Sequence, residues 1–170
     1  SFSKSIAPAI RVGYIVADWP IISRLLPLKT DAGSGAIEQM ALAGYIGDHF
    51  ASHVDALRQT LKGKADALAN ALAEHFGEAA EFDKPVSGIF LWVTLPETVD
   101  TTRLFQVAGA EGVAINPGVE WSTDDAYGRR RIRICFANPS IETIHAGVAK
   151  LADICHREFG VPMQSGNIQR

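Results

Sequence analysis

Apolar residues recur every three or four positions between residues 49 and 76. This spacing places them on one face of an amphipathic helix, and Gly77 follows as a residue suited to end it. We therefore expect a helix of roughly 28 residues, about 40 Å long. A shorter helix is predicted over residues 36–46, with Gly47-Asp48 breaking and recapping the chain between the two. The apolar stripe consists of Phe50, Val54, Leu57, Leu61, Ala65, Leu68, Leu72 and Phe76.

The C-terminal half of the chain mixes strand and helix patterns. Alternating apolar positions predict two strands and a short third one, and helical spacing predicts two helices that each follow a good N-cap residue. This order of elements is typical of an α+β domain. The strands are expected over residues 87–95, 113–116 and 131–137, and the helices over residues 101–110 (after Asp100) and 141–159 (after Ser140).

The N-terminal part of the chain carries shorter patterns. Residues 11–17 have the composition of a buried strand. Asp18 suits the N-cap of a helix that begins at Trp19, and Pro27 ends or kinks that helix. Small and polar residues over 30–35 predict a loop.

Composition and charge exclude several classes of protein. Of the 170 residues, 47% are apolar and 21% are charged, as in globular proteins, and the net charge of −3 gives no electrostatic basis for nucleic-acid binding. No apolar run reaches the length of a membrane span and no signal peptide is recognised, so we expect a cytoplasmic protein without a membrane partner. Cys135 and Cys155 lie in apolar patterns without metal-ligand spacing, so we expect two buried free thiols and no metal site.

The clearest candidate chemistry lies in Ser1-Phe2-Ser3-Lys4, followed by Arg11. Hydroxyl groups and arginine are what proteins use to hold a phosphate dianion. A deprotonated lysine amine forms a Schiff base with an aldehyde. Pyridoxal 5′-phosphate (PLP) carries both an aldehyde and a phosphate. An ordinary polar surface loop has the same residue types, so spacing alone leaves both interpretations open.

Four segments, in order along the chain, resemble the fold-type I (class I/II) PLP-dependent aminotransferases. The resemblance is to the branch that contains 2-aminoadipate-type aminotransferases and the aminotransferase-like domains of MocR regulators. The stretch from Ser1 to Tyr14 resembles the lysine segment of the family. Three later stretches resemble its small-domain strand, its Gly-Val…Pro-Gly segment and its substrate-arginine strand, and they cover residues 85–93, 112–118 and 132–136.

This resemblance implies an α/β fold class, with an α+β C-terminal small domain and the last part of a PLP-transferase large domain. It implies large-domain residues over 1–48, a long interdomain helix over 49–77, the small domain over 78–161 and a tail over 162–170. Family members are considerably longer. We therefore expect the C-terminal portion of a larger, homodimeric enzyme, and no activity from these 170 residues alone.

The resemblance also implies roles for five residues. Lys4 would carry the cofactor and move a proton during the reaction, while Ser1, Ser3 and Arg11 would bind the cofactor phosphate. Arg133 would bind the substrate α-carboxylate through a bidentate contact.

A structural role for Arg133 is the alternative to substrate binding. An arginine within an apolar strand is costly to bury unless it is paired, and a structural ion pair with a carboxylate such as Glu120 would also satisfy it. Arg131 lies on the same strand face and is the competing candidate, but the family pattern favours Arg133. Trp121 either lines the substrate mouth or belongs to ordinary packing.

The resulting functional hypothesis is transfer of an amino group between an L-amino acid and a 2-oxo acid. Two alternatives remain open. One is the effector-sensing domain of a MocR-type transcriptional regulator, and the other is a different PLP reaction on the same fold, such as a β-lyase or decarboxylase reaction. No nucleic-acid partner is expected for this segment.

Overall fold

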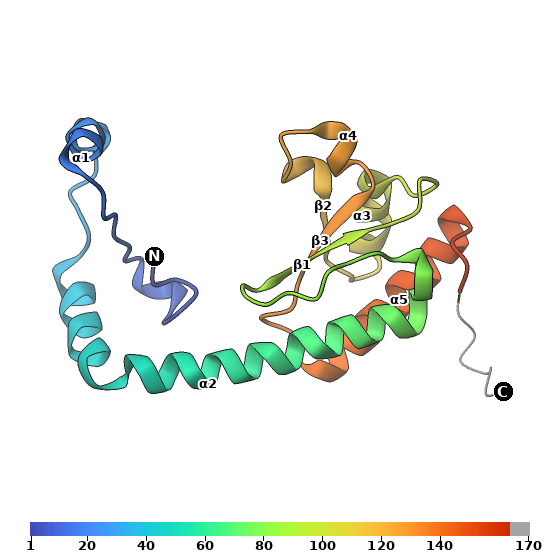
Figure 1. Ribbon diagram of the computed structural model, residues 1–170, viewed down its shortest axis with the longest axis horizontal. Coiled ribbons are helices and arrows are strands. Elements are labelled where there is room, and N and C mark those ends of the chain that lie inside the picture. Colours follow the sequence, from blue (N-terminus) through green and yellow to red (C-terminus); the bar gives the residue numbers. More distant parts are fainter. Residues whose placement is uncertain (164–170) are drawn as a thin grey trace. The chain divides into compact units, whose positions relative to one another are not determined.

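The computed structural model describes residues 1–163 and divides the chain into two compact units, Ser1–Gln59 and Thr60–Arg170 (Figure 1). The long helix α2 (Ala36–Phe76) belongs to both units. The tail predicted for residues 162–170 lies outside the described residues from 164 onward. Across the described part of the chain, no helix is both long enough and apolar enough to cross a bilayer.

The first unit begins with the short 3₁₀ helix η1 (Pro8–Ile10) and continues with α1 (Trp19–Leu25) and a second 3₁₀ turn, η2 (Leu26–Leu28). As predicted, α1 follows Asp18 and has a proline in its first turn, where the missing amide hydrogen costs nothing. Pro27 lies in η2, just beyond the end of α1, as the sequence also predicts.

Residues 11–17 do not form the buried strand that the sequence predicts. Tyr14, Ile15 and Val16 are 67%, 67% and 87% exposed. A strand needs a neighbouring strand to satisfy its backbone hydrogen bonds, and none of the strands in the described residues pairs with this segment. Within residues 1–59, Leu42 is the one buried hydrophobic side chain, so this unit has little core of its own.

Helix α2 runs from Ala36 to Phe76, where the sequence predicts two helices separated at Gly47-Asp48. A glycine in a helix interior costs only about 1 kcal/mol relative to alanine, and helix propagation on both sides outweighs it. Figure 1 shows the ribbon of α2 turning sharply within its first half. Gly77 then ends the helix with a φ of 53°, a left-handed conformation that favours glycine.

The second unit is built on a three-stranded antiparallel sheet in the order β1-β3-β2. Its strands are β1 (Phe90–Thr94), β2 (Asn116–Pro117) and β3 (Arg131–Cys135). Because side chains alternate along each strand, one face is apolar and the other carries polar and aromatic residues. The strands lie inside the predicted ranges, except that β2 begins at the end of its predicted range and extends one residue beyond it.

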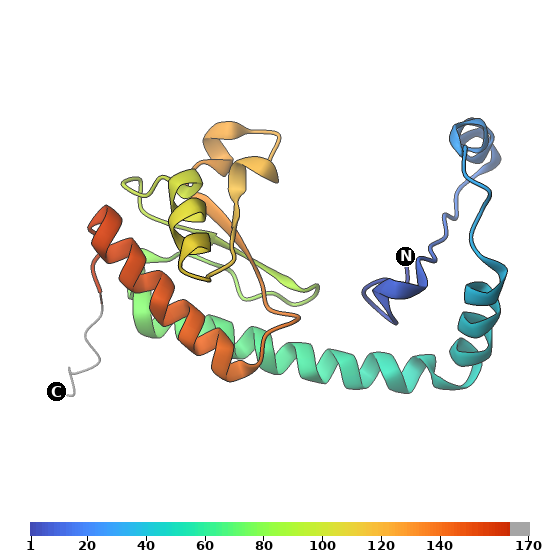
Figure 2. The same ribbon diagram turned by 180° about the vertical axis from the view of Figure 1, so that it is seen from behind.

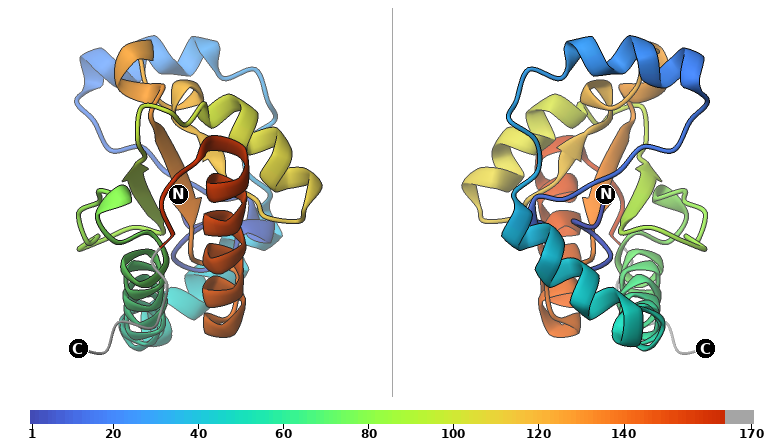
Figure 3. Two further views of the ribbon diagram at one scale, coloured as in Figure 1. Left: turned by 90° about the vertical axis from the view of Figure 1, so that its right-hand side faces the viewer. Right: turned by 90° about the vertical axis from the view of Figure 1, so that its left-hand side faces the viewer.

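Helices cover the apolar face of this sheet. They are α3 (Thr101–Ala110), α5 (Ile141–Phe159) and the last turns of α2, which share one core with the sheet residues Leu91, Val93 and Ile132. Figure 2 shows α3 and α5 in front of the sheet, and Figure 3 shows α5 beside the last turns of α2. The mixed helical and sheet architecture agrees with the fold class predicted from the sequence.

Helices α3 and α5 begin after the N-cap residues that the sequence predicts. The Asp100 carboxylate accepts hydrogen bonds from the backbone amides of Thr102 and Arg103, and the Ser140 hydroxyl accepts one from Thr143. These side chains satisfy amide groups that have no partner within the helix. The remaining short elements are η3 (Gly77–Ala79), η4 (Gly118–Glu120) and α4 (Asp125–Gly128).

The two cysteines differ in their surroundings. Cys155 is buried, as predicted, and burial raises the pKa of its thiol to about 12. Cys135, which the sequence also places in the interior, is exposed. It ends β3 on the same strand face as Arg131 and Arg133, and its apolar neighbours in the sequence do not bury it.

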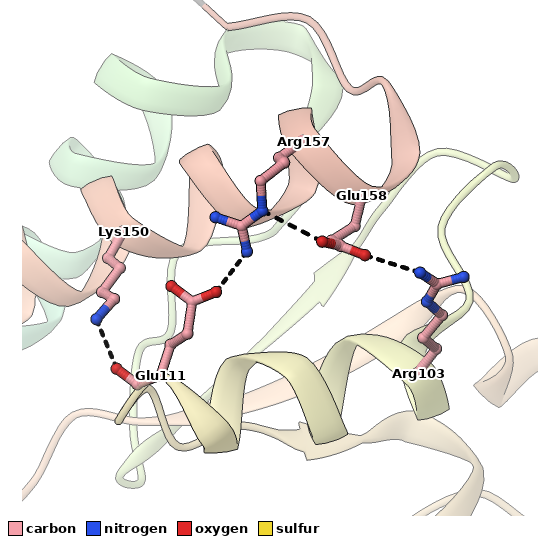
Figure 4. Close-up of polar contacts among 5 residues, drawn as sticks. All are labelled: Arg103, Glu111, Lys150, Arg157 and Glu158. Atoms are coloured by element: carbon pink, nitrogen blue, oxygen red, sulfur yellow. Dashed lines mark hydrogen bonds and ion pairs between the residues drawn. The ribbon is translucent and has the colours of Figure 1, made fainter.

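An ion-pair network joins α3 to α5 (Figure 4). Glu158 accepts from Arg103 at 2.8 Å and from Arg157 at 3.2 Å, and Arg157 also pairs with Glu111. Lys150 donates to the Glu111 carbonyl oxygen at 2.6 Å. The hydrogen bond from Arg157, followed by that from Arg103, lowers the pKa of Glu158 below its ordinary value of 4.5.

We expect this network to make the second unit sensitive to acid. Because the pKa of Glu158 is lower in the folded state, its contribution to stability is present above pH 4.5 and is lost as the pH falls through the folded value. Urea unfolding at successively lower pH should show this loss, and Glu158→Gln should reduce it. Glu74→Gln, which removes an exposed carboxylate of α2, is the matched control and should leave the pH dependence unchanged. An identical acid response in wild type and Glu158→Gln would contradict the assignment.

Candidate functional site

The N-terminal loop brings together three of the side chains that the sequence singles out. The Ser1 hydroxyl donates to the Ser3 Oγ at 3.1 Å, and an Arg11 guanidinium nitrogen donates to the same Ser3 Oγ at 3.4 Å. The Ser3 amide also donates to the Ser1 Oγ at 3.2 Å. Two hydroxyls and one guanidinium therefore converge within a single loop.

Backbone contacts close this loop. The Phe2 amide donates to the Val12 carbonyl at 3.1 Å, and the amides of Ile6 and Ala7 donate to the Phe2 carbonyl. The rings of Phe2 and Tyr14 lie 5.5 Å apart between centroids. These contacts bring the chain back on itself, so that Arg11 reaches Ser3 across eight positions of sequence.

Arg11 adopts a left-handed backbone conformation with φ of 55° and ψ of 32°. It is the one residue other than glycine with positive φ in the described residues. Such a conformation costs about 1–3 kcal/mol and is concentrated at functional sites in proteins. Here it accompanies a guanidinium that donates to the Pro8 carbonyl at 3.0 Å as well as to Ser3.

Lys4 follows Ser3 directly and is exposed. Within the described residues its amine has no hydrogen-bond or ion-pair partner. The loop thus offers two hydroxyls and a guanidinium for an anion, next to an amine without a competing partner. This donor set fits a phosphate group, and the adjacent lysine fits the aldehyde of PLP. Residues 1–163 contain no group of acidic, histidine and cysteine side chains arranged to hold a metal ion.

A second polar group lies on the open face of the sheet in the second unit, around Arg133. The register places Arg133 of β3 opposite Trp92 of β1 and opposite Asn116 of β2. Its Cζ lies 4.0 Å from the ring centroid of Phe90 and 3.1 Å from that of Trp121. One terminal nitrogen approaches the Asn116 Oδ1 at 3.4 Å, while the buried Nε has no hydrogen-bond partner in the described structure.

The neighbouring Arg131 is already engaged. Its guanidinium lies 3.6 Å from the ring centroid of Tyr127 and donates to the Tyr127 carbonyl oxygen. Arg133, in contrast, forms no ion pair with Glu120 or any other acidic residue described in the structure. Arg133 therefore has free donor capacity for an anion, and the geometry favours it over Arg131 for that role.

Sequence reasoning did not connect Phe90 or Asn116 with Arg133, and it left Trp121 undecided. These contacts depend on the register of three strands that are distant in sequence. The alternation of β1 does place Phe90 and Trp92 on one face, but it does not say which arginine they meet.

The second unit also contains an apolar cavity of about 350 Å³. No aspartate, glutamate, lysine, arginine or histidine side chain lines it, so it offers no charged group to a ligand. Among its lining residues are Leu68, Ile115, Phe136, Ile144, Val148 and Leu151.

Comparison with known proteins identifies the family of the chain that carries the N-terminal loop and the Arg133 site. Residues 1–151 match the family "Aminotransferase class I and II". The chain belongs to this family. It is 30% identical over 162 residues to Aromatic-amino-acid aminotransferase 1 of Thermococcus litoralis, a match that covers 94% of this chain and 39% of the relative. It is 34% identical over 155 residues to the HTH-type transcriptional regulator NorG of Staphylococcus aureus, covering 89% of this chain and 34% of the regulator.

A solved structure of an aminotransferase agrees with this family assignment. The α-aminoadipate aminotransferase LysN of Thermus thermophilus, in complex with N-(5′-phosphopyridoxyl)-L-leucine, superposes with a TM-score of 0.81 at 28% identity. The match covers 90% of this chain and 40% of LysN. This chain thus spans between about a third and two fifths of the length of the relatives compared.

Proposed function

We propose that this chain supplies the cofactor lysine and the substrate arginine of a PLP-dependent aminotransferase, which transfers an amino group between an L-amino acid and a 2-oxo acid. The convergence of Ser1, Ser3 and Arg11 in the loop that bears Lys4 carries the proposal, in a chain of the class I and II family. The phosphopyridoxyl compound bound by LysN supports PLP as the cofactor.

PLP, when bound, supplies an electron sink for charge that develops at the substrate Cα. In this proposal Ser1, Ser3 and Arg11 hold its phosphate by hydrogen bonds from two hydroxyls and a guanidinium. Lys4 would carry the covalent attachment and, with its amine neutral, would move a proton between the substrate Cα and the C4′ carbon of the cofactor. Arg133 binds the α-carboxylate and so orients the substrate.

The organisation of the whole protein is part of the same proposal. Residues 1–48 would complete a large domain, residues 49–77 would link it to a small domain over 78–161, and the protein would act as a cytoplasmic homodimer. The family resemblance supports these features. The exposed apolar side chains of residues 1–59 support a further covering surface for that unit.

A second candidate function is effector sensing in a MocR-type transcriptional regulator. The specific observation in its favour is the 34% identity with NorG over 155 residues. Such a domain would use the same loop and the same arginine to bind a cofactor and an amino acid, but it would not need sustained turnover.

Amino-transfer assays on the complete gene product distinguish the two candidates. With PLP, an aminotransferase should convert a panel of L-amino acids and 2-oxo acids over many cycles. The 170-residue chain alone is the comparison, and we expect no sustained turnover from it because residues 1–59 have little core to fix the Lys4 loop. Amino-acid binding without turnover, together with DNA binding, would favour the regulator. Sustained turnover by the 170-residue chain would contradict our view of the first unit.

A further inference from the structure

Two aromatic rings from different parts of the second unit contact the Arg133 guanidinium. Phe90 belongs to β1 and Trp121 follows η4, and their ring centroids lie 4.0 Å and 3.1 Å from the Arg133 Cζ. Both contacts are within the range of a cation–π interaction. Trp121 is 52% exposed, so the ring both contacts the guanidinium and faces solvent.

Two aromatic contacts leave a guanidinium with restricted access. When rings occupy the faces of the planar group, an anion must approach along its edge, where the N–H bonds point. The Asn116 Oδ1 lies near one terminal nitrogen at 3.4 Å, and the buried Nε has no acceptor within the described residues. A buried donor without a partner costs free energy, and a carboxylate at this edge would satisfy it.

The position of Trp121 depends on Gly118, where two backbone segments approach each other unusually closely. The Trp121 amide donates to the Gly118 carbonyl at 3.0 Å. A side chain at Gly118 would collide with the carbonyl oxygens of Gly128 and Arg131, so only glycine lets η4 lie this close to α4 and β3. The fold thus fixes the segment that presents Trp121 to Arg133.

We propose that Phe90 and Trp121 are positioning residues that clamp the Arg133 guanidinium, so that its open edge meets the substrate carboxylate. This inference rests on the proposed function of Arg133 as the carboxylate-binding residue. Phe90 and Trp121 act through Arg133, and neither takes part in the chemistry of the cofactor. The clamp makes the site selective for a ligand with two in-plane acceptors, which a carboxylate has and a carboxamide lacks.

The test is NMR of the arginine side-chain Nε–Hε groups in the full 170-residue chain. Arg133→Lys identifies the Arg133 signal by removing it. We expect an upfield-shifted Hε in the wild type because the guanidinium carbon lies over two aromatic rings. The signal should return toward its ordinary position in Trp121→Ala and should keep its shift in Trp121→Phe. Tyr127→Ala removes the equivalent ring from Arg131 and is the matched control, which should leave the Arg133 signal unchanged. Unchanged methyl signals of the buried Leu104 verify that each variant is folded.

Titration with propionate, and with propionamide as the uncharged control, adds the binding test. Propionate should shift the Arg133 signal while propionamide does not, and Trp121→Ala should weaken propionate binding by about three- to tenfold. Trp121→Phe should restore most of it. An ordinary Hε position in the wild type, or equal propionate affinity in wild type and Trp121→Ala, would overturn the clamp. A shifted Hε that responds to Trp121→Ala but not to propionate would support the clamp as a structural feature and overturn the proposed carboxylate role of Arg133.

Discussion

Replacing Lys4 with alanine should abolish covalent attachment of PLP to the complete gene product. Lys4 lies in the same loop as Ser1, Ser3 and Arg11, the residues that are proposed to bind the cofactor phosphate. Its amine has no partner in the described structure. Loss of the residue that moves the proton should also lower the amino-transfer rate about 10²- to 10⁴-fold or more. Borohydride reduction followed by peptide mass mapping should place a pyridoxyl group on the wild-type peptide that contains Lys4.

Lys29→Ala is the matched control for this experiment. Lys29 is a second lysine of the first unit, and it pairs with Asp31 rather than lying in the loop with Ser1 and Ser3. This variant should keep the label on Lys4 and should keep its activity. A pyridoxyl group on any other lysine in the wild type would refute the assignment of Lys4.

Arg133→Lys should lower kcat/KM for amino-acid substrates about 30- to 150-fold, because lysine keeps the charge but lacks the planar fork. Loss of a charge-assisted bidentate contact costs about 2–3 kcal/mol. The affinity for PLP should change little, because the residues proposed to bind its phosphate are Ser1, Ser3 and Arg11. Steady-state kinetics and a PLP titration of the same preparation measure the two effects separately.

Arg131→Lys is the corresponding control on the same strand face. The Arg131 guanidinium already contacts the Tyr127 ring and its carbonyl oxygen, so it has less capacity for a substrate. We expect a much smaller change in kcat/KM than for Arg133→Lys. An unchanged kcat/KM in Arg133→Lys, or a larger loss in Arg131→Lys, would show that the carboxylate binds elsewhere.

The candidate cofactor loop could be predicted largely from sequence because its members are close in the chain. Ser1, Ser3 and Lys4 are near neighbours, and Arg11 returns to Ser3 through one short 3₁₀ helix. The hydroxyl, amine and guanidinium types already indicate phosphate and aldehyde chemistry. Their roles as cofactor ligands remain a prediction, which the Lys4 experiment tests.

The surroundings of Arg133 could not be predicted in the same way. The sequence identifies the strand and the face of Arg133, because alternation is a local property of the chain. The contacts with Phe90 and Trp121 require the β1–β3 register and the close approach of Gly118 to Gly128 and Arg131. Arg131 and Arg133 share one face, so only these contacts distinguish the engaged arginine from the one with free donors.

The sequence by itself determined the elements whose stability is local. Asp100 and Ser140 cap their helices through hydrogen bonds within three residues, and the apolar stripe of α2 follows from helical periodicity. Only the tertiary structure decided which apolar segments are covered. Tyr14, Ile15, Val16 and Cys135 lie in apolar stretches of the sequence yet are exposed, because burial depends on elements from elsewhere in the fold and none covers them in the described structure.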